Sequence, residues 1–202
     1  MMLLQLFVIA ALGVIAFFCY QTFQPQLLGD IEGRNSAKPV ADLNKLLDAS
    51  VKLQRKIEIS EEELNIYIKK RLRISQGGSF RKDCKAQNVL VRLTDGQMEV
   101  IIERTLRGKP HTVSMFLETA TRNDQYGRAI PSLERTGARL GQLKLPPAYV
   151  LLVQESFIKI KDALKKELDV GFDQMGHIEF LDGKLILNPN RQVVSPQTPG
   201  NL

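Results

Sequence analysis

Tryptophan is absent from the 202 residues, cysteine and histidine occur twice each, and aromatic side chains make up only 6%. The cysteines, Cys19 and Cys84, provide no disulfide framework, and the distant histidines, His111 and His177, add no zinc-ligand spacing. A folded core must therefore be built from leucine, isoleucine and valine. A hydrophobic content of 44% and a charged content of 25% are typical of globular chains, which excludes disorder throughout.

The signatures of common enzymes are also missing. The sequence has no Gly-x-Ser-x-Gly, no glycine-rich phosphate loop and no His-Glu-x-x-His. His111 and His177 fit surface positions near turns better than catalytic bases. Glu99 and Glu103 fit a solvated strand face better than a catalytic pair. We therefore predict no enzymatic activity, no cofactor and no metal site.

Charge is missing from the chain before Asp30. An apolar helix of about 20 residues matches a hydrocarbon core of about 30 Å. A cleaved signal peptide would need a basic start and small residues at a cleavage site, and residues 17–20 read Phe-Phe-Cys-Tyr instead. Phe18 before Cys19 also disfavours lipid attachment. We predict an uncleaved transmembrane anchor at residues 1–20.

The predicted organisation is an anchor, a linker at residues 21–39, a domain at residues 40–190 and a disordered tail at residues 191–202. The tail has two prolines and few apolar residues. Positive charge near a membrane helix usually marks the cytoplasmic side, and the near flank of this anchor holds only Asp30 and Glu32. We therefore expect a single-pass protein of the cell membrane with its C-terminal domain outside the cytoplasm.

Local signals inside the domain predict an α+β fold. Apolar residues at helical spacing from Val40 to Leu53 predict a short helix, and residues 56–60 alternate like a strand. Ser60 and Glu63 form a capping box for a helix that ends near Leu72. Two Asp-Gly pairs, at residues 95–96 and 182–183, predict hairpins. Pro146-Pro147 opens a long amphipathic helix, and we predict a curved antiparallel sheet wrapping this helix.

Three local sequences resemble those of the YpmS-like family of membrane-anchored extracytoplasmic proteins. They are SEEELNIYI from Ser60, VRLTDGQMEVIIERTLRGKP from Val91 and LGQLKLPPAYVLLVQESF from Leu140. The resemblance covers roughly residues 50–190, and the insertion at residues 77–85 departs from the family pattern. It implies an envelope module, related to domains in which a sheet wraps a helix and binds lipid.

The excess positive charge of the chain lies in one segment. Residues 69–85 carry a net charge of +6, which equals the net charge of the whole chain. The segment has one acid, Asp83, and seven basic residues that we call the basic patch: Lys69, Lys70, Arg71, Arg73, Arg81, Lys82 and Lys85. The negative end of a helix dipole favours the first four of these. Three interpretations remain open: a solvated face, a contact with anionic lipid or an acidic envelope polymer, and nucleic-acid binding, which the scarcity of nearby aromatic residues disfavours.

The long helix carries an apolar stripe with two possible interpretations. The stripe is either a core face or one wall of a lipid-sized groove lined by Tyr149, Val150, Val153, Phe157, Ile160 and Leu164. Residues 149–153 are apolar on every side, which favours the groove. We predict a non-enzymatic module that binds lipid or another amphiphile near its membrane. The alternative is a structural or interaction subunit of a cell-envelope assembly that meets a partner protein.

Overall fold

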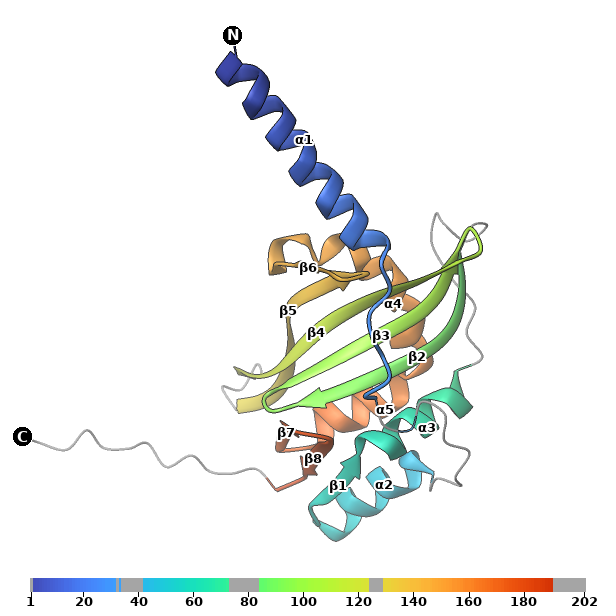
Figure 1. Cartoon of the computed structure of the whole chain (residues 1–202). Coiled ribbons are helices and arrows are strands. Elements are labelled where there is room, and N and C mark those ends of the chain that lie inside the picture. Colours follow the sequence, from blue (N-terminus) through green and yellow to red (C-terminus); the bar gives the residue numbers. More distant parts are fainter. Residues whose placement is uncertain (1, 32, 34–41, 73–83, 124–128, 191–202) are drawn as a thin grey trace, which may run out of the picture.

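A five-stranded antiparallel sheet, in the order β2-β3-β4-β5-β6, forms the larger part of the domain (Figure 1). The computed structural model describes residues 2–31, 33, 42–72, 84–123 and 129–190. The predicted hairpin at Asp95-Gly96 is confirmed, because β2 and β3 pair across a turn in which Gly96 has a φ of 73°. The strands are β2 (Cys84–Thr94), β3 (Gln97–Leu106), β4 (Lys109–Asn123), β5 (Ala129–Leu140) and β6 (Leu143–Leu145).

A second, three-stranded sheet joins distant parts of the chain. Its order is β1-β8-β7, from β1 (Ile57–Ser60), β7 (His177–Leu181) and β8 (Lys184–Asn188). The predicted hairpin at Asp182-Gly183 is confirmed as β7–β8. The turns of the two hairpins bond to each other: Gly96 N–H donates to the carbonyl oxygen of Phe180 (2.9 Å), and Gly183 N–H donates to that of Leu93 (3.1 Å).

Helices stand both before and after the larger sheet in the chain. The capping box is confirmed, because Glu63 N–H donates to Ser60 Oγ (3.2 Å) and Ser60 N–H donates to Glu63 Oε2 (2.9 Å). The single long helix is interrupted at Leu164, whose φ and ψ are −104° and 16°. No glycine or proline stands there to signal the break. The helices are α1 (Met2–Phe23), α2 (Leu43–Leu53), α3 (Glu61–Arg71), η1 (Pro147–Tyr149), α4 (Leu151–Ala163), α5 (Lys165–Asp169) and η2 (Val170–Gln174).

The main core lies between one face of the five-stranded sheet and α4. Val153 and Phe157 of α4 are buried in the same cluster as Val89 and Val113 of the sheet. Every second residue of β2 points to this face, as expected for a strand. An α+β fold with antiparallel sheets and an apolar N-terminal helix is therefore confirmed.

The β2 edge of the larger sheet is covered by α3. Asn65 Oδ1 accepts from Val91 N–H (2.6 Å), and Asn65 Nδ2 donates to the Val91 carbonyl oxygen (2.8 Å), so this side chain bonds like a neighbouring strand. Glu61 Oε2 accepts from Leu93 N–H (2.7 Å). Helix α3 thus satisfies edge groups that would otherwise attract another strand.

Candidate functional site

Helix α1 leaves the domain with its apolar surface uncovered (Figure 1). None of its residues is buried, and it is long and apolar enough to cross a membrane. A core helix of a soluble protein would be covered by its own domain, and this one is not. By its length and composition the helix is a candidate single-pass anchor. It extends to Phe23, three residues beyond the predicted end.

The segment after α1 lies on the sheet. We call residues 24–31 the strap; they lie within the predicted linker and cross the sheet face opposite to α4 (Figure 1). Leu28 and Ile31 of the strap are buried against Leu90 and Ile101 of the sheet. The strap therefore turns this sheet face into a second, small apolar core. Residues 21–23 of the predicted linker belong to α1, and residues 32 and 34–39 lie outside the described residues, as does the predicted tail, 191–202.

Polar groups fasten the strap along its length. Gln26 N–H donates to Thr112 Oγ1 (3.0 Å), and Gln26 Nε2 donates to Ser114 Oγ (3.1 Å). Arg92 Nη2 donates to the Leu27 carbonyl oxygen (3.2 Å) and to Asp30 Oδ1 (3.0 Å). The bonds come from β4 and β2, on either side of β3, so they fix the direction of the strap as well as its contact.

Glu99 connects these groups from within the sheet. Its carboxylate accepts from Arg92 Nη1 (2.7 Å) and Ser114 Oγ (2.5 Å) and lies 3.4 Å from Arg139 Nη1. The residue is only 4% exposed, so the predicted solvated position of Glu99 is wrong. Glu99 does lie on the strand face that points away from α4, but no sequence pattern indicates that the strap covers that face.

The β5–β6 turn holds the end of α1. Gly141 N–H donates to the Thr112 carbonyl oxygen (2.8 Å), and Gln142 N–H donates to that of Gln21 (3.0 Å). A Cβ atom added to Gly141 would lie 2.3 Å from the Thr22 carbonyl oxygen. Gly141 also has a φ of 60°, which other residues rarely adopt. Both the backbone angle and the close approach of Thr22 therefore require glycine at this position.

His111 completes the attachment of α1. Arg104 Nε donates to His111 Nδ1 (3.2 Å), so Nε2 carries the proton and donates to the Thr22 carbonyl oxygen (3.0 Å). The residue is 3% exposed. Burial and the positive charge of Arg104 lower the pKa of His111 to about 4. The predicted surface position of His111 is therefore wrong, and the ring is a neutral structural bridge.

An exposed apolar surface lies next to the exit of α1. We call Tyr149, Leu151 and Leu152 the apolar tip; they are 55%, 74% and 71% exposed. They follow β6, which contacts α1, and Figure 1 shows β6 beside the end of that helix. Large apolar side chains gathered on a surface mark a site of interaction.

The six residues of the predicted groove do not share one environment. Val150, Val153 and Phe157 are buried in the main core, and Ile160 packs against that core. Leu164 is half-buried at the helix break, and Tyr149 belongs to the apolar tip. None of the six lines either of the two pockets described below. Helical periodicity could not distinguish a core stripe from a groove wall.

The described part of the basic patch lies away from the membrane helix. Lys69, Lys70 and Arg71 are exposed at the end of α3, which lies at the far end of the domain from α1 (Figure 1). Arg73, Arg81 and Lys82 lie outside the described residues, as does the side chain of Lys85. Electrostatic attraction to a bilayer falls off over about 10 Å.

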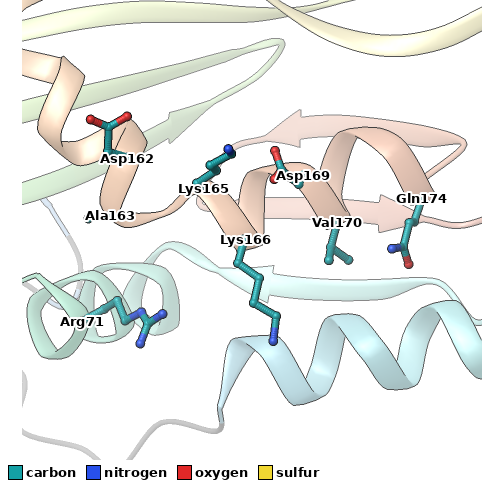
Figure 2. A pocket seen from close by; sticks show the side chains of 8 residues that line it. All are labelled: Arg71, Asp162, Ala163, Lys165, Lys166, Asp169, Val170 and Gln174. Atoms are coloured by element: carbon teal, nitrogen blue, oxygen red, sulfur yellow. The ribbon is translucent and has the colours of Figure 1, made fainter.

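Arg71 shares a pocket with basic residues from the C-terminal helices. This pocket has a volume of about 450 Å³ and lies between α3 and the α4–α5 break (Figure 2). Lys165 and Lys166 contribute the other positive charges, and Asp162 and Asp169 contribute negative ones. No local pattern in the sequence indicates that Arg71 lies beside Lys165 and Lys166, because it is more than 90 residues away from them in the chain.

A hydrogen-bonded cluster behind this pocket joins three helices. Tyr67 Oη donates to Glu167 Oε1 (2.5 Å), Asn44 Nδ2 donates to the same oxygen (3.1 Å), and Arg71 Nε lies 3.4 Å from it. Burial and the bond to Glu167 raise the pKa of Tyr67 to about 12. For Glu167, burial raises the pKa, but the bonds from Tyr67 and Asn44 outweigh it, so the pKa is lowered.

The described residues hold no group of three His, Cys, Asp or Glu side chains able to bind a metal ion. Comparison of the whole chain with family models, with curated proteins and with solved structures finds no match. The similarity to the YpmS-like family therefore stays a prediction.

Proposed function

We propose that this chain is a non-enzymatic, single-pass membrane protein whose domain lies outside the cytoplasm and binds lipid at the membrane surface. The carrying observation is the apolar tip beside the exit of α1. In this proposal the larger sheet is a curved cover around α4, and the lipid contact is made at the end of that cover. The contact needs no internal groove.

The composition of the tip suits the membrane interface. Burying a leucine side chain contributes about 1.5–3 kcal/mol, so Leu151 and Leu152 together can hold the domain on a bilayer to which it is already tied. Tyrosine is enriched where the hydrocarbon meets the headgroups, because its ring is apolar and its hydroxyl is polar. In this proposal Tyr149 lies at that boundary, next to Leu151 and Leu152.

The strap supports a fixed rather than a freely tethered domain. Buried contacts begin at Gln26, three residues after α1 ends, and continue to Ile31. A domain joined by a flexible linker would present every face to the bilayer in turn. This domain presents the β6–η1 end.

Tryptophan fluorescence tests the proposal, because the chain has no tryptophan of its own. Leu152→Trp places one in the tip, and Leu53→Trp places one at the end of α2, at an exposed leucine on the opposite end of the domain. The full chain is reconstituted in phosphatidylcholine vesicles with brominated acyl chains. We expect bromine to quench the fluorescence of Leu152→Trp and to leave that of Leu53→Trp unchanged. Equal emission from Leu152→Trp with and without bromine contradicts the proposal.

The pocket in Figure 2 favours a second function, as a subunit of an envelope assembly. Arg71, Lys165 and Lys166 gather around it at a distance from α1, where an acidic protein or envelope polymer can reach them. Because α3 covers the β2 edge along Val91 and Leu93, such a partner would meet charge rather than this stretch of backbone.

Retention of the full chain on a polyglutamate resin tests this second function. Replacing Arg71, Lys165 and Lys166 with glutamine should release the protein at much lower salt. Replacing the exposed Lys52, Lys109 and Lys184 removes the same charge elsewhere and is the control. If both triple variants elute at the same salt concentration, retention depends only on net charge, and the second function is contradicted.

A further inference from the structure

A second pocket, of about 390 Å³, lies on the strap side of the sheet. Its wall includes Arg92 and Arg139, which both bond to the strap, together with Glu99 and Thr136. Lys144 of β6 adds a third positive charge, and Phe116 and Leu145 add apolar surface. The pocket therefore lies beside residues that hold the strap and is bounded by β6, one of the strands that contact α1.

A β-bulge forms part of the pocket wall. Phe116 pairs with Gly137 and Leu117 pairs with Arg135, so Thr136 is an extra residue with no partner across the strand. Bulges are common beside binding sites, because they re-aim a side chain. At Gly137 an added Cβ would lie 3.2 Å from the Leu145 carbonyl oxygen, so β6 closes tightly against the bulge.

Unpaired polar atoms are concentrated in the same wall. Five buried side-chain polar atoms of the described residues have no hydrogen-bond partner, and three of them are Thr136 Oγ1, Arg92 Nε and Arg139 Nε. A buried N–H without a partner is costly, and native structures contain few of them. A cluster of two guanidinium groups and a hydroxyl calls for an acceptor.

The charge balance selects an anion. Arg92 and Arg139 share Glu99, at 2.7 and 3.4 Å, and Arg92 also meets Asp30 at 3.0 Å. With Lys144, three positive charges face two negative ones. The Arg139 guanidinium lies over the Phe116 ring, 5.3 Å from its centroid, which holds its plane in place. A fixed guanidinium suits the oxygens of phosphate.

We propose that this pocket binds a phosphate group, either of a lipid headgroup or of a free phosphate ester. The Arg92 and Arg139 guanidinium groups and the Thr136 hydroxyl donate to its oxygens, and Lys144 supplies charge at the rim. Phe116 takes the carbon atoms next to the phosphate. The inference goes beyond the proposed function, because it holds whether or not the apolar tip enters the bilayer.

Calorimetric titration of the full chain in maltoside micelles, which contain no phosphate, tests the proposal. The probes are inorganic phosphate, dihexanoylphosphatidic acid and dihexanoylglycerol. We expect binding of the two phosphate probes and none of dihexanoylglycerol. Tighter binding of the phosphatidic acid identifies a headgroup as the ligand, and equal binding identifies a free phosphate ester. Failure of both phosphate probes, or equal binding of dihexanoylglycerol, overturns the proposal.

Two variants link binding to this pocket. Thr136→Val and Lys144→Gln should each weaken phosphate binding about tenfold, the loss expected for one charged hydrogen bond. Thr136→Val should leave the melting temperature of the ligand-free chain equal or higher, because it removes an unpaired buried hydroxyl. Lys144 is exposed, so its variant keeps the fold in any case. The controls are Thr121→Val and Lys109→Gln, at exposed positions outside the pocket. Unchanged binding by both pocket variants overturns the proposal.

Discussion

His111 donates a hydrogen bond from Nε2 to the carbonyl oxygen of Thr22 and so ties the last turn of α1 to β4. The Arg104 bond requires a neutral ring, because Arg104 donates to Nδ1; the bond to Thr22 can be donated by a neutral or a protonated ring. A second proton, on Nδ1, would point at a guanidinium. Burial and Arg104 therefore keep neutral the imidazole that holds the end of the membrane helix.

Acidification should destabilise the fold through His111. The pKa of His111 is about 4 in the fold and about 6.5 in an unfolded chain, so the unfolded state binds the extra proton between these values. The stabilisation is complete above pH 6.5 and is lost as the pH falls through 4. The slope is at most about 1.4 kcal/mol per pH unit. Thermal unfolding in maltoside micelles from pH 7 to pH 4.5 measures it.

The measurement is made in the His177→Gln variant, so that His111 is the one histidine left in the chain. His111→Gln in that background should lose the slope between pH 6.5 and pH 4.5 and be less stable at pH 7. An unchanged slope without His111 would assign the pH dependence to carboxylates.

Gly141→Ala should detach the end of α1. The new methyl group would meet the Thr22 carbonyl oxygen at 2.3 Å, where only the backbone can move. Gly108→Ala is the matched control, because Gly108 has a φ of 79° and nothing within 4 Å of an added Cβ. The control should lower the free energy of unfolding by about 1–2 kcal/mol, the cost of a left-handed alanine. Gly141→Ala should exceed that cost clearly in the same thermal unfolding assay, and equal losses would mean that the contact is loose.

Asn65→Ala should destabilise the domain by about 2–5 kcal/mol, because it leaves the N–H and carbonyl groups of Val91 buried without partners. Asn123→Ala, at an exposed position on β4, should change stability by less than about 0.5 kcal/mol. Hydrogen exchange gives a local reading: the Val91 amide should exchange much faster in Asn65→Ala. An unchanged exchange rate at Val91 would show that the sheet edge needs no cover from α3.

Features set by neighbouring residues could be predicted from the sequence. The Ser60–Glu63 capping box and both Asp-Gly hairpins depend on contacts within a few residues, and the structure has all of them. The pairing of β1 with β8 joins Ile57 to Leu187, and no local pattern specifies such a distant partner.

The candidate site was harder to predict for the same reason. The strap looks like a linker in sequence, because its polar residues form no local pattern. Gln26, for example, is held in place by hydrogen bonds to Thr112 and Ser114, which are distant in the chain. Residues 149–153 did carry a signal, an apolar run too wide for one sheet contact. The structure divides that run: Val150 and Val153 enter the core, and the apolar tip faces outward.

Neutron reflectometry of the full chain in a supported bilayer tests the central claim most directly, that the strap and the apolar tip hold the domain on the membrane surface. It measures the density profile along the bilayer normal without a label. We predict a protein layer that begins within the headgroup region, with no water layer between lipid and domain. A resolved water layer between the headgroups and the protein would contradict the account.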